Sequence, residues 1–195
     1  MARLLIAALL GGLVHYLWGT LSWTVLPFHT MTMNQAPDEA GLSAALAALP
    51  ESGVYYIPGM PHDHATGAAT PEQVEAWAAR HRAGPLASIY LRLEGAQPMS
   101  PRVFAVGFLL SASSAFLVAL ILKAAAIATY RLRAAIGALI GVFLAIQADL
   151  MLWNYMFFPL DHTLAMMLDA VAGWTLAGLA IAAVMRPARP VPPLA

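Results

Sequence analysis

Four stretches of the chain are apolar over enough residues to cross a lipid bilayer as helices. They cover residues 3–26, 103–130, 134–158 and 163–185. A hydrocarbon core about 30 Å thick needs about 20 apolar residues in a helix, and each stretch reaches that length. The pattern predicts an all-α membrane protein built as a bundle of four transmembrane helices.

The pattern changes between the first two stretches, where turn residues separate shorter elements. One helix is expected after the N-cap residue Asp38 and another after Thr70. Residues 53–58 and 86–93 have the composition or the alternation of strands. Residues 27–101 therefore predict a small α/β insertion between the first two helices. Two strands are marginally stable alone, so we expect the insertion to pack on the ends of the membrane helices.

The positions of Lys and Arg predict the orientation of the helices. Short loops rich in Lys and Arg stay in the cytoplasm, whereas loops longer than about 60 residues cross largely regardless of charge. We expect both termini, including the Pro-rich tail 186–195, to be cytoplasmic and residues 27–101 to be extracytoplasmic, in a bacterial inner membrane. The marker residues are Arg3, Lys123, Arg131, Arg133, Arg186 and Arg189.

The first stretch also begins like a cleaved signal peptide. A signal peptide has an apolar core of about 7–15 residues and a small-residue cleavage site. Here the apolar run continues through Trp18, Trp23 and Leu26, and no Ala-x-Ala site follows. We therefore expect residues 3–26 to remain as a helix.

Composition supports the membrane interpretation and excludes several functions. The chain is 61% hydrophobic and 10% charged, whereas soluble domains carry about 25% charged residues. Ten Lys and Arg balance ten Asp and Glu without a basic block, which excludes a basic nucleic-acid-binding domain. Cys is absent, which excludes disulfides and thiol catalysis.

Small residues at helical spacing predict close contacts between helices, because they let backbones approach each other. Packing within the bundle is the favoured explanation. An interface in a homo-oligomer or with a partner subunit is the alternative. The predicted packing residues are Ser111, Ala115, Gly137, Gly141 and Gly173.

Polar side chains also fall inside the predicted spans. Such groups are costly in hydrocarbon, so they usually face the bundle interior and have a partner. We favour a buried His–Asp pair that locks helices together; the alternative is a half-pathway for protons or ions that opens outward. The predicted cluster is His15, Asp149, Asn154 and Asp169, with Asp161 and His162 at its outer lip.

Two segments rich in His and Met offer a possible metal site. Imidazole and thioether ligands together suit copper. A solvated loop explains the same residues and is the interpretation we favour. The candidate ligands are His29, Met31, Met33, Met60, His62 and His64.

Two motifs stand out: WTVLPFH at residues 23–29 overlaps the end of the first predicted helix, and ESGVYYIP lies at residues 51–58. Asp38-Glu39 lies between them, and Gly84-Pro85 follows further on. The pattern resembles a group of uncharacterised bacterial integral membrane proteins, over most of the chain from the first helix through the second. The resemblance implies the architecture and carries no activity or ligand. His62 and His64 are not part of it.

These observations predict a non-enzymatic accessory or scaffold subunit of a membrane assembly, with the lipid bilayer and other membrane chains as partners. The alternative is a protein that handles protons, small solutes or copper through the His/Asp cluster or the His/Met segments. A membrane-embedded enzyme acting on a lipid or quinone has least support, because no nucleophile and base can be paired along the sequence.

Overall fold

The computed structural model describes residues 1–61 and 67–186, and the chain divides into two units. The helical unit contains residues 1–34 and the chain from residue 98 onward, and the inserted unit contains residues 35–97. His62, His64 and the tail from residue 187 lie outside the described residues.

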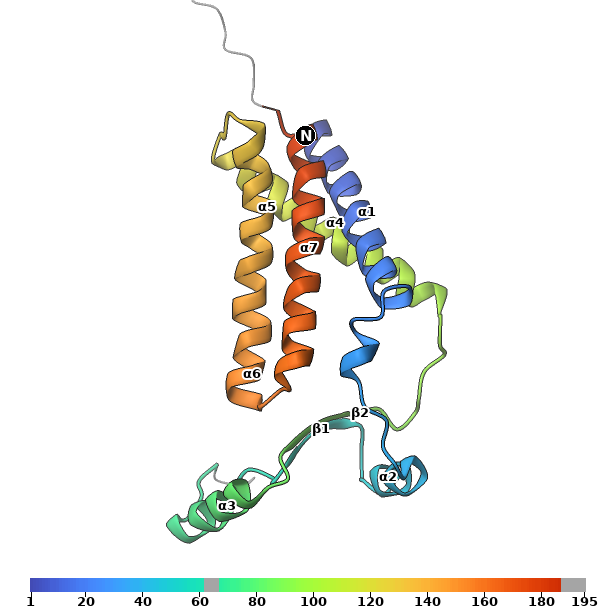
Figure 1. Ribbon diagram of the computed structural model, residues 1–195, viewed down its shortest axis with the longest axis vertical. Coiled ribbons are helices and arrows are strands. Elements are labelled where there is room, and N and C mark those ends of the chain that lie inside the picture. The colour runs from blue at the N-terminus through green and yellow to red at the C-terminus, as the bar shows by residue number, and fades with distance from the viewer. Residues whose placement is uncertain (62–66, 187–195) are drawn as a thin grey trace, which may run out of the picture. The chain divides into compact units, whose positions relative to one another are not determined.

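Four helices of the helical unit are long and apolar enough to cross a membrane (Figure 1). Three are α1 (Ala2–Thr24), α4 (Pro101–Ala124) and α7 (Leu160–Val184). The fourth span, Tyr130–Met156, joins α5 (Tyr130–Leu144), a π-helical turn η2 (Ala145–Leu150) and α6 (Met151–Met156). The four-helix architecture predicted from the apolar stretches is therefore present.

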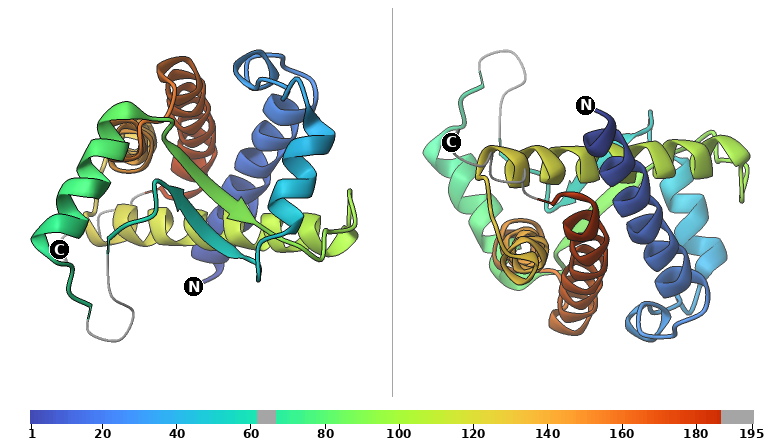
Figure 2. Two further views of the ribbon diagram at one scale, coloured as in Figure 1. Left: turned by 90° about the horizontal axis from the view of Figure 1, so that it is seen from below. Right: turned by 90° about the horizontal axis from the view of Figure 1, so that it is seen from above.

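The helices pack in the order α4, α1, α7, α5. Helix α1 packs on both α4 and α7, and α5 packs along α7. In Figure 2, α5 is seen end-on while α4 runs across the view, so these two helices are steeply inclined to each other. The main apolar core lies where α1, α4 and α7 meet, around Ala7, Ala115 and Ile181. Helix α5 therefore stands at one edge of the unit.

Glycines set the closest helix approaches. A Cβ built on Gly137 would lie 2.5 Å from the Cα of Gly178, and one on Gly141 would lie 2.9 Å from the carbonyl oxygen of Ala170. Both contacts join α5 to α7, so the predicted packing residues Gly137 and Gly141 lie at a helix contact. Between α1 and α4, a Cβ on Gly12 would lie 2.4 Å from the Cα of Ala112.

The second helix ends earlier than the sequence predicts. The apolar run reaches residue 130, but α4 stops at Ala124 and the chain turns at Ala126, whose φ is +49°. Thr129 then caps α5, because its hydroxyl oxygen accepts a hydrogen bond from the backbone N–H of Leu132 at 3.4 Å. Hydropathy could not detect this turn, because its residues are themselves mostly apolar.

Arg133 holds the turn between α4 and α5 against the end of α7. The side chain is 4% exposed. Its guanidinium donates to the carbonyl oxygens of Ile127 at 3.0 Å, Ala128 at 2.7 Å and Ala182 at 3.3 Å. Ala182 lies in the last turn of α7, where a cation is favoured by the helix dipole.

The inserted unit contains α2 (Glu39–Ala47), β1 (Gly53–Ile57), α3 (Pro71–Ala83) and β2 (Ala87–Leu91). The strands form an antiparallel pair in which Tyr55 lies opposite Ile89. Asp38 caps α2 by accepting from the N–H of Gly41 at 2.9 Å. At the start of α3, Thr70 and Gln73 form a reciprocal capping box. These local signals explain why short elements form where the sequence predicts them.

The described residues of the inserted unit include none that is buried. Its strands carry large side chains that remain open: Val54 is 52% exposed, Tyr56 37% and Tyr90 68%. A two-stranded sheet needs packing on a further surface for stability. The unit therefore presents apolar side chains that it does not cover with its own described residues.

Candidate functional site

Asp169 on α7 is the centre of a polar cluster at one end of the helical unit. The indole Nε1 of Trp18 on α1 donates to Asp169 Oδ1 at 2.7 Å and approaches the backbone oxygen of Asp169 at 3.2 Å. The other carboxylate oxygen, Oδ2, lies 3.6 Å from Nε2 of His29. The carboxylate thus connects α7 to α1 and to the chain that follows α1.

His29 is buried beneath aromatic rings. Its side chain is 1% exposed. The imidazole stacks on Trp23, with ring centroids 4.0 Å apart and planes 11° apart, and it contacts Phe28 at 4.2 Å. Among the described residues neither ring nitrogen has a hydrogen-bond partner. Buried polar atoms are normally hydrogen-bonded, so this imidazole is an exception. Its nearby polar group is the carboxylate of Asp169.

His15 links α1 to α4. Its Nδ1 lies 3.2 Å from the hydroxyl oxygen of Ser111, and its ring lies 4.7 Å from that of Trp174. Gly173 leaves room for the side chains of His15 and Trp18, because a Cβ there would lie 3.4 Å from Cδ2 of His15 and 2.8 Å from Cδ1 of Trp18. The sequence offered Ser111 no neighbouring base, whereas the fold places His15 beside it.

Within the described residues, no carboxylate hydrogen-bonds to the second ring nitrogen of His15 to form a triad with Ser111. In a triad, a carboxylate orients the histidine through its second ring nitrogen. Asp169 is the candidate for this carboxylate, but its two oxygens contact Trp18 and His29. The pair therefore serves as a contact between two helices.

A second histidine fixes the segment after α1 to the start of α7. Nδ1 of His162 lies 3.0 Å from the hydroxyl oxygen of Thr32, in the short helix η1 (Thr30–Thr32). That hydroxyl donates to the backbone oxygen of His29 at 2.8 Å, so His162 is the donor to Thr32. Asp161 accepts from the N–H of His162 at 2.8 Å. The two predicted lip residues are thus adjacent to this contact.

Asp149 lies in the π-helical turn and is half-buried. It interacts electrostatically with His162 and Asp169. Asp169 in turn interacts electrostatically with His15. Asn154 differs, because its side chain is exposed. The fold therefore brings His15, Asp149 and Asp169 toward one region and leaves Asn154 outside it. The sequence pattern did not reveal the π-helical turn, a feature often found at functional sites.

The candidate metal ligands of the helical unit do not share one site in the part of the chain that the structure describes. His29 is turned toward Asp169, while Met31 is 78% exposed and Met33 48%. Met60 belongs to the inserted unit and is 60% exposed there. No group of three or more His, Asp or Glu that could hold a metal occurs in the part of the chain that the structure describes.

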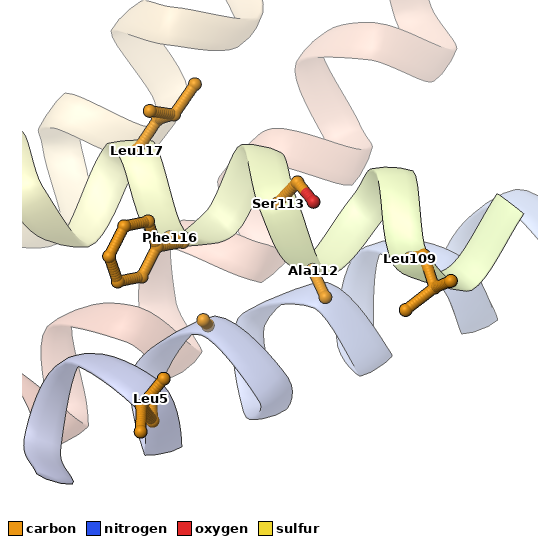
Figure 3. Close-up of a pocket in the computed structure, with 7 residues that line it drawn as sticks. Leu5, Leu109, Ala112, Ser113, Phe116 and Leu117 are labelled. Atoms are coloured by element: carbon orange, nitrogen blue, oxygen red, sulfur yellow. The ribbon is translucent and has the colours of Figure 1, made fainter. Parts of the chain in front are cut away.

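An open apolar groove of about 490 Å³ lies between α1 and α4. Figure 3 shows Phe116 and Leu109 on either side of Ala112, above Leu5 on α1. Ser113 supplies a hydroxyl, and the remaining lining residues are Ala8 and Leu117. The mostly apolar lining of this groove suits a hydrocarbon chain.

The described polar side chains of the cluster connect separate elements and place no nucleophile before an open binding site. Hydrogen bonds between helices are a recognised means of holding membrane bundles together. The chain matches no protein-family model, no curated protein and no solved structure.

Proposed function

We propose that this chain is a small integral protein of the bacterial inner membrane that acts as a non-enzymatic accessory or scaffold subunit. Four long apolar helices support a membrane location. Arg3 donates to the backbone oxygen of Arg186 at 3.4 Å, so the two ends of the helical unit are adjacent. With the distribution of Lys and Arg, this favours cytoplasmic termini and an extracytoplasmic segment 27–101.

The inserted unit carries the proposal. It has regular helices and a paired sheet, yet none of its described residues is buried. Tyr90 on β2 is 68% exposed. Exposed apolar patches on ordered units commonly mark interaction surfaces. A partner protein in the membrane assembly would cover these side chains and complete the core.

The polar cluster supports a structural role for the helical unit. Trp18, His15 and His162 each connect one element to another, through Asp169, Ser111 and Thr32 respectively. A rigid helical platform is what a scaffold requires to hold the inserted unit at the membrane surface.

Photo-crosslinking in intact cells tests the proposal. A photoreactive amino acid at Tyr90 samples the exposed sheet, and one at Ala79, an exposed residue of α3, serves as the control. The proposal predicts a discrete product with another membrane protein at position 90 that is absent at position 79. Equal amounts of crosslinked product at both positions, or only intramolecular crosslinks, would contradict it.

A proton-handling role is the second candidate, and one observation favours it. His29 is buried, its ring nitrogens accept or donate no hydrogen bond among the described residues, and its Nε2 lies 3.6 Å from the carboxylate of Asp169. A proton bound between them would convert this contact into a charged pair. Proton flux into vesicles, lost in Asp169→Asn and Asp149→Asn, would favour this role; no flux in the parent protein would remove it.

A further inference from the structure

Gln147 is an amide on the outward face of an apolar helix. It lies in η2, and its side chain is exposed. Phe143, one turn before it, is 61% exposed, and Met151, one turn after it, is 44% exposed. Among the described residues the side-chain amide of Gln147 has no hydrogen-bond partner.

The position of Asp149 explains why Gln147 faces outward. Residues two apart on a helix lie on nearly opposite sides. Asp149 is within electrostatic reach of His162 and Asp169 on α7, so Gln147 lies on the side away from α7. Helix α5 and η2 pack on α7, which leaves the face that carries Gln147 uncovered in the described chain.

The depth of Gln147 places this amide in hydrocarbon. It lies nine residues before Met156, the end of the span, which corresponds to about 13 Å along a helix. Headgroups and water do not reach that depth, and an amide without a partner there is strongly disfavoured. Asn154, two residues from the same end, lies at the level of the headgroups and needs no protein partner.

We propose that the face of α5 and η2 around Gln147 is a dimer interface that binds a second copy of this chain. A two-fold axis along the membrane normal brings each residue to its own counterpart at the same depth. The glutamine amide is both a hydrogen-bond donor and an acceptor, so the Gln147 amides of two copies can hydrogen-bond to each other. Any other partner must carry a polar group at this one depth. The inference rests on the membrane location in the proposed function.

The absence of Cys from the sequence allows a clean crosslinking test. Phe143→Cys places one thiol beside Gln147 and keeps the amide. Leu109→Cys places a thiol on α4, at a residue that is 61% exposed and eight residues from the end of its helix at Pro101. The two reporters are thus equally exposed, at 61% each, and lie on different helices.

Mild oxidation of native membranes should link Phe143→Cys into a species of twice the mass and leave Leu109→Cys monomeric. Adding Gln147→Leu to Phe143→Cys should lower the linked fraction about five-fold, because an interhelical hydrogen bond contributes about that factor. Gln147→Asn should retain part of the linkage. Membrane content of the Gln147→Leu protein, measured alongside, controls for folding.

Equal linkage at positions 109 and 143, no linkage at 143, or linkage unaffected by Gln147→Leu would overturn the dimer. So would a linked species of any mass other than two copies. Extraction with alkaline carbonate separates this failure from failure of the proposed function. A chain that stays in the membrane but does not link refutes only the dimer, whereas a chain that is washed off refutes the membrane location and the dimer together.

Discussion

Trp18 and Asp169, which are 151 residues apart in sequence, are joined by a hydrogen bond of 2.7 Å from the indole Nε1 to Oδ1. The bond connects the first long helix to the last. Asp169 also faces His29, so one carboxylate positions both α1 and the chain that follows it. The cluster at this end of the unit depends on that residue.

Replacing Trp18 with Phe should therefore weaken the contact between α1 and α7. The ring is largely retained while the donor is lost, so we expect a loss of about 1–3 kcal/mol in the free energy of unfolding. Unfolding in detergent micelles measures it. Trp153→Phe, at a residue 43% exposed, is the matched control and should change little. Equal losses in the two variants would contradict a specific role for the bond.

Gly137→Ala should separate α5 from α7. The added Cβ would lie 2.5 Å from the Cα of Gly178 and 2.8 Å from the carbonyl oxygen of Trp174. Backbone atoms must move to relieve these contacts, and overpacking of this kind costs about 1–3 kcal/mol. Gly19→Ala is the control, because a Cβ there meets nothing within 4 Å. Thermal stability in micelles should fall for position 137 only.

Arg133→Met should loosen the turn between α4 and α5. The methionine fills similar space but leaves the carbonyl oxygens of Ile127 and Ala128 without their donor, at a cost of about 1–3 kcal/mol. Amide exchange across residues 125–129 should become faster. Arg131→Met, at an exposed residue, should leave exchange unchanged, and faster exchange there would argue against a specific clamp.

The start of α3 should lose stability in acid. The backbone N–H of Glu72 and then the Thr70 hydroxyl bond to the Glu72 carboxylate and hold its pKa below the usual value. A lowered pKa in the folded state stabilises the helix at neutral pH, and this contribution disappears as the pH falls through the folded-state pKa. Amide exchange in residues 71–84 should distinguish Glu72→Gln from the parent at pH 7, and the difference should shrink as the pH is lowered through the carboxyl titration. A difference that does not change with pH would contradict a role for the Glu72 charge.

The sequence predicted the four apolar helices and the local caps because both depend on nearby residues. Length and hydropathy locate a span, and Asp38 or Thr70 begins a helix through its own side chain. Which side chains contact each other between the helices could not be predicted in the same way. That Trp18 reaches Asp169, or that His29 turns inward while Met31 turns outward, depends on how helices rotate and cross.

Accessibility of single cysteines in intact cells tests the proposed membrane arrangement. Ala40→Cys lies on exposed α2 and Ala125→Cys in the exposed turn after α4. A maleimide that cannot cross the inner membrane should label position 40 in cells whose outer membrane is permeable. Position 125 should react only after the inner membrane is opened. Labelling of position 125 while position 40 is protected would reverse the orientation, and immediate labelling of both would contradict a membrane-spanning chain with its ends inside.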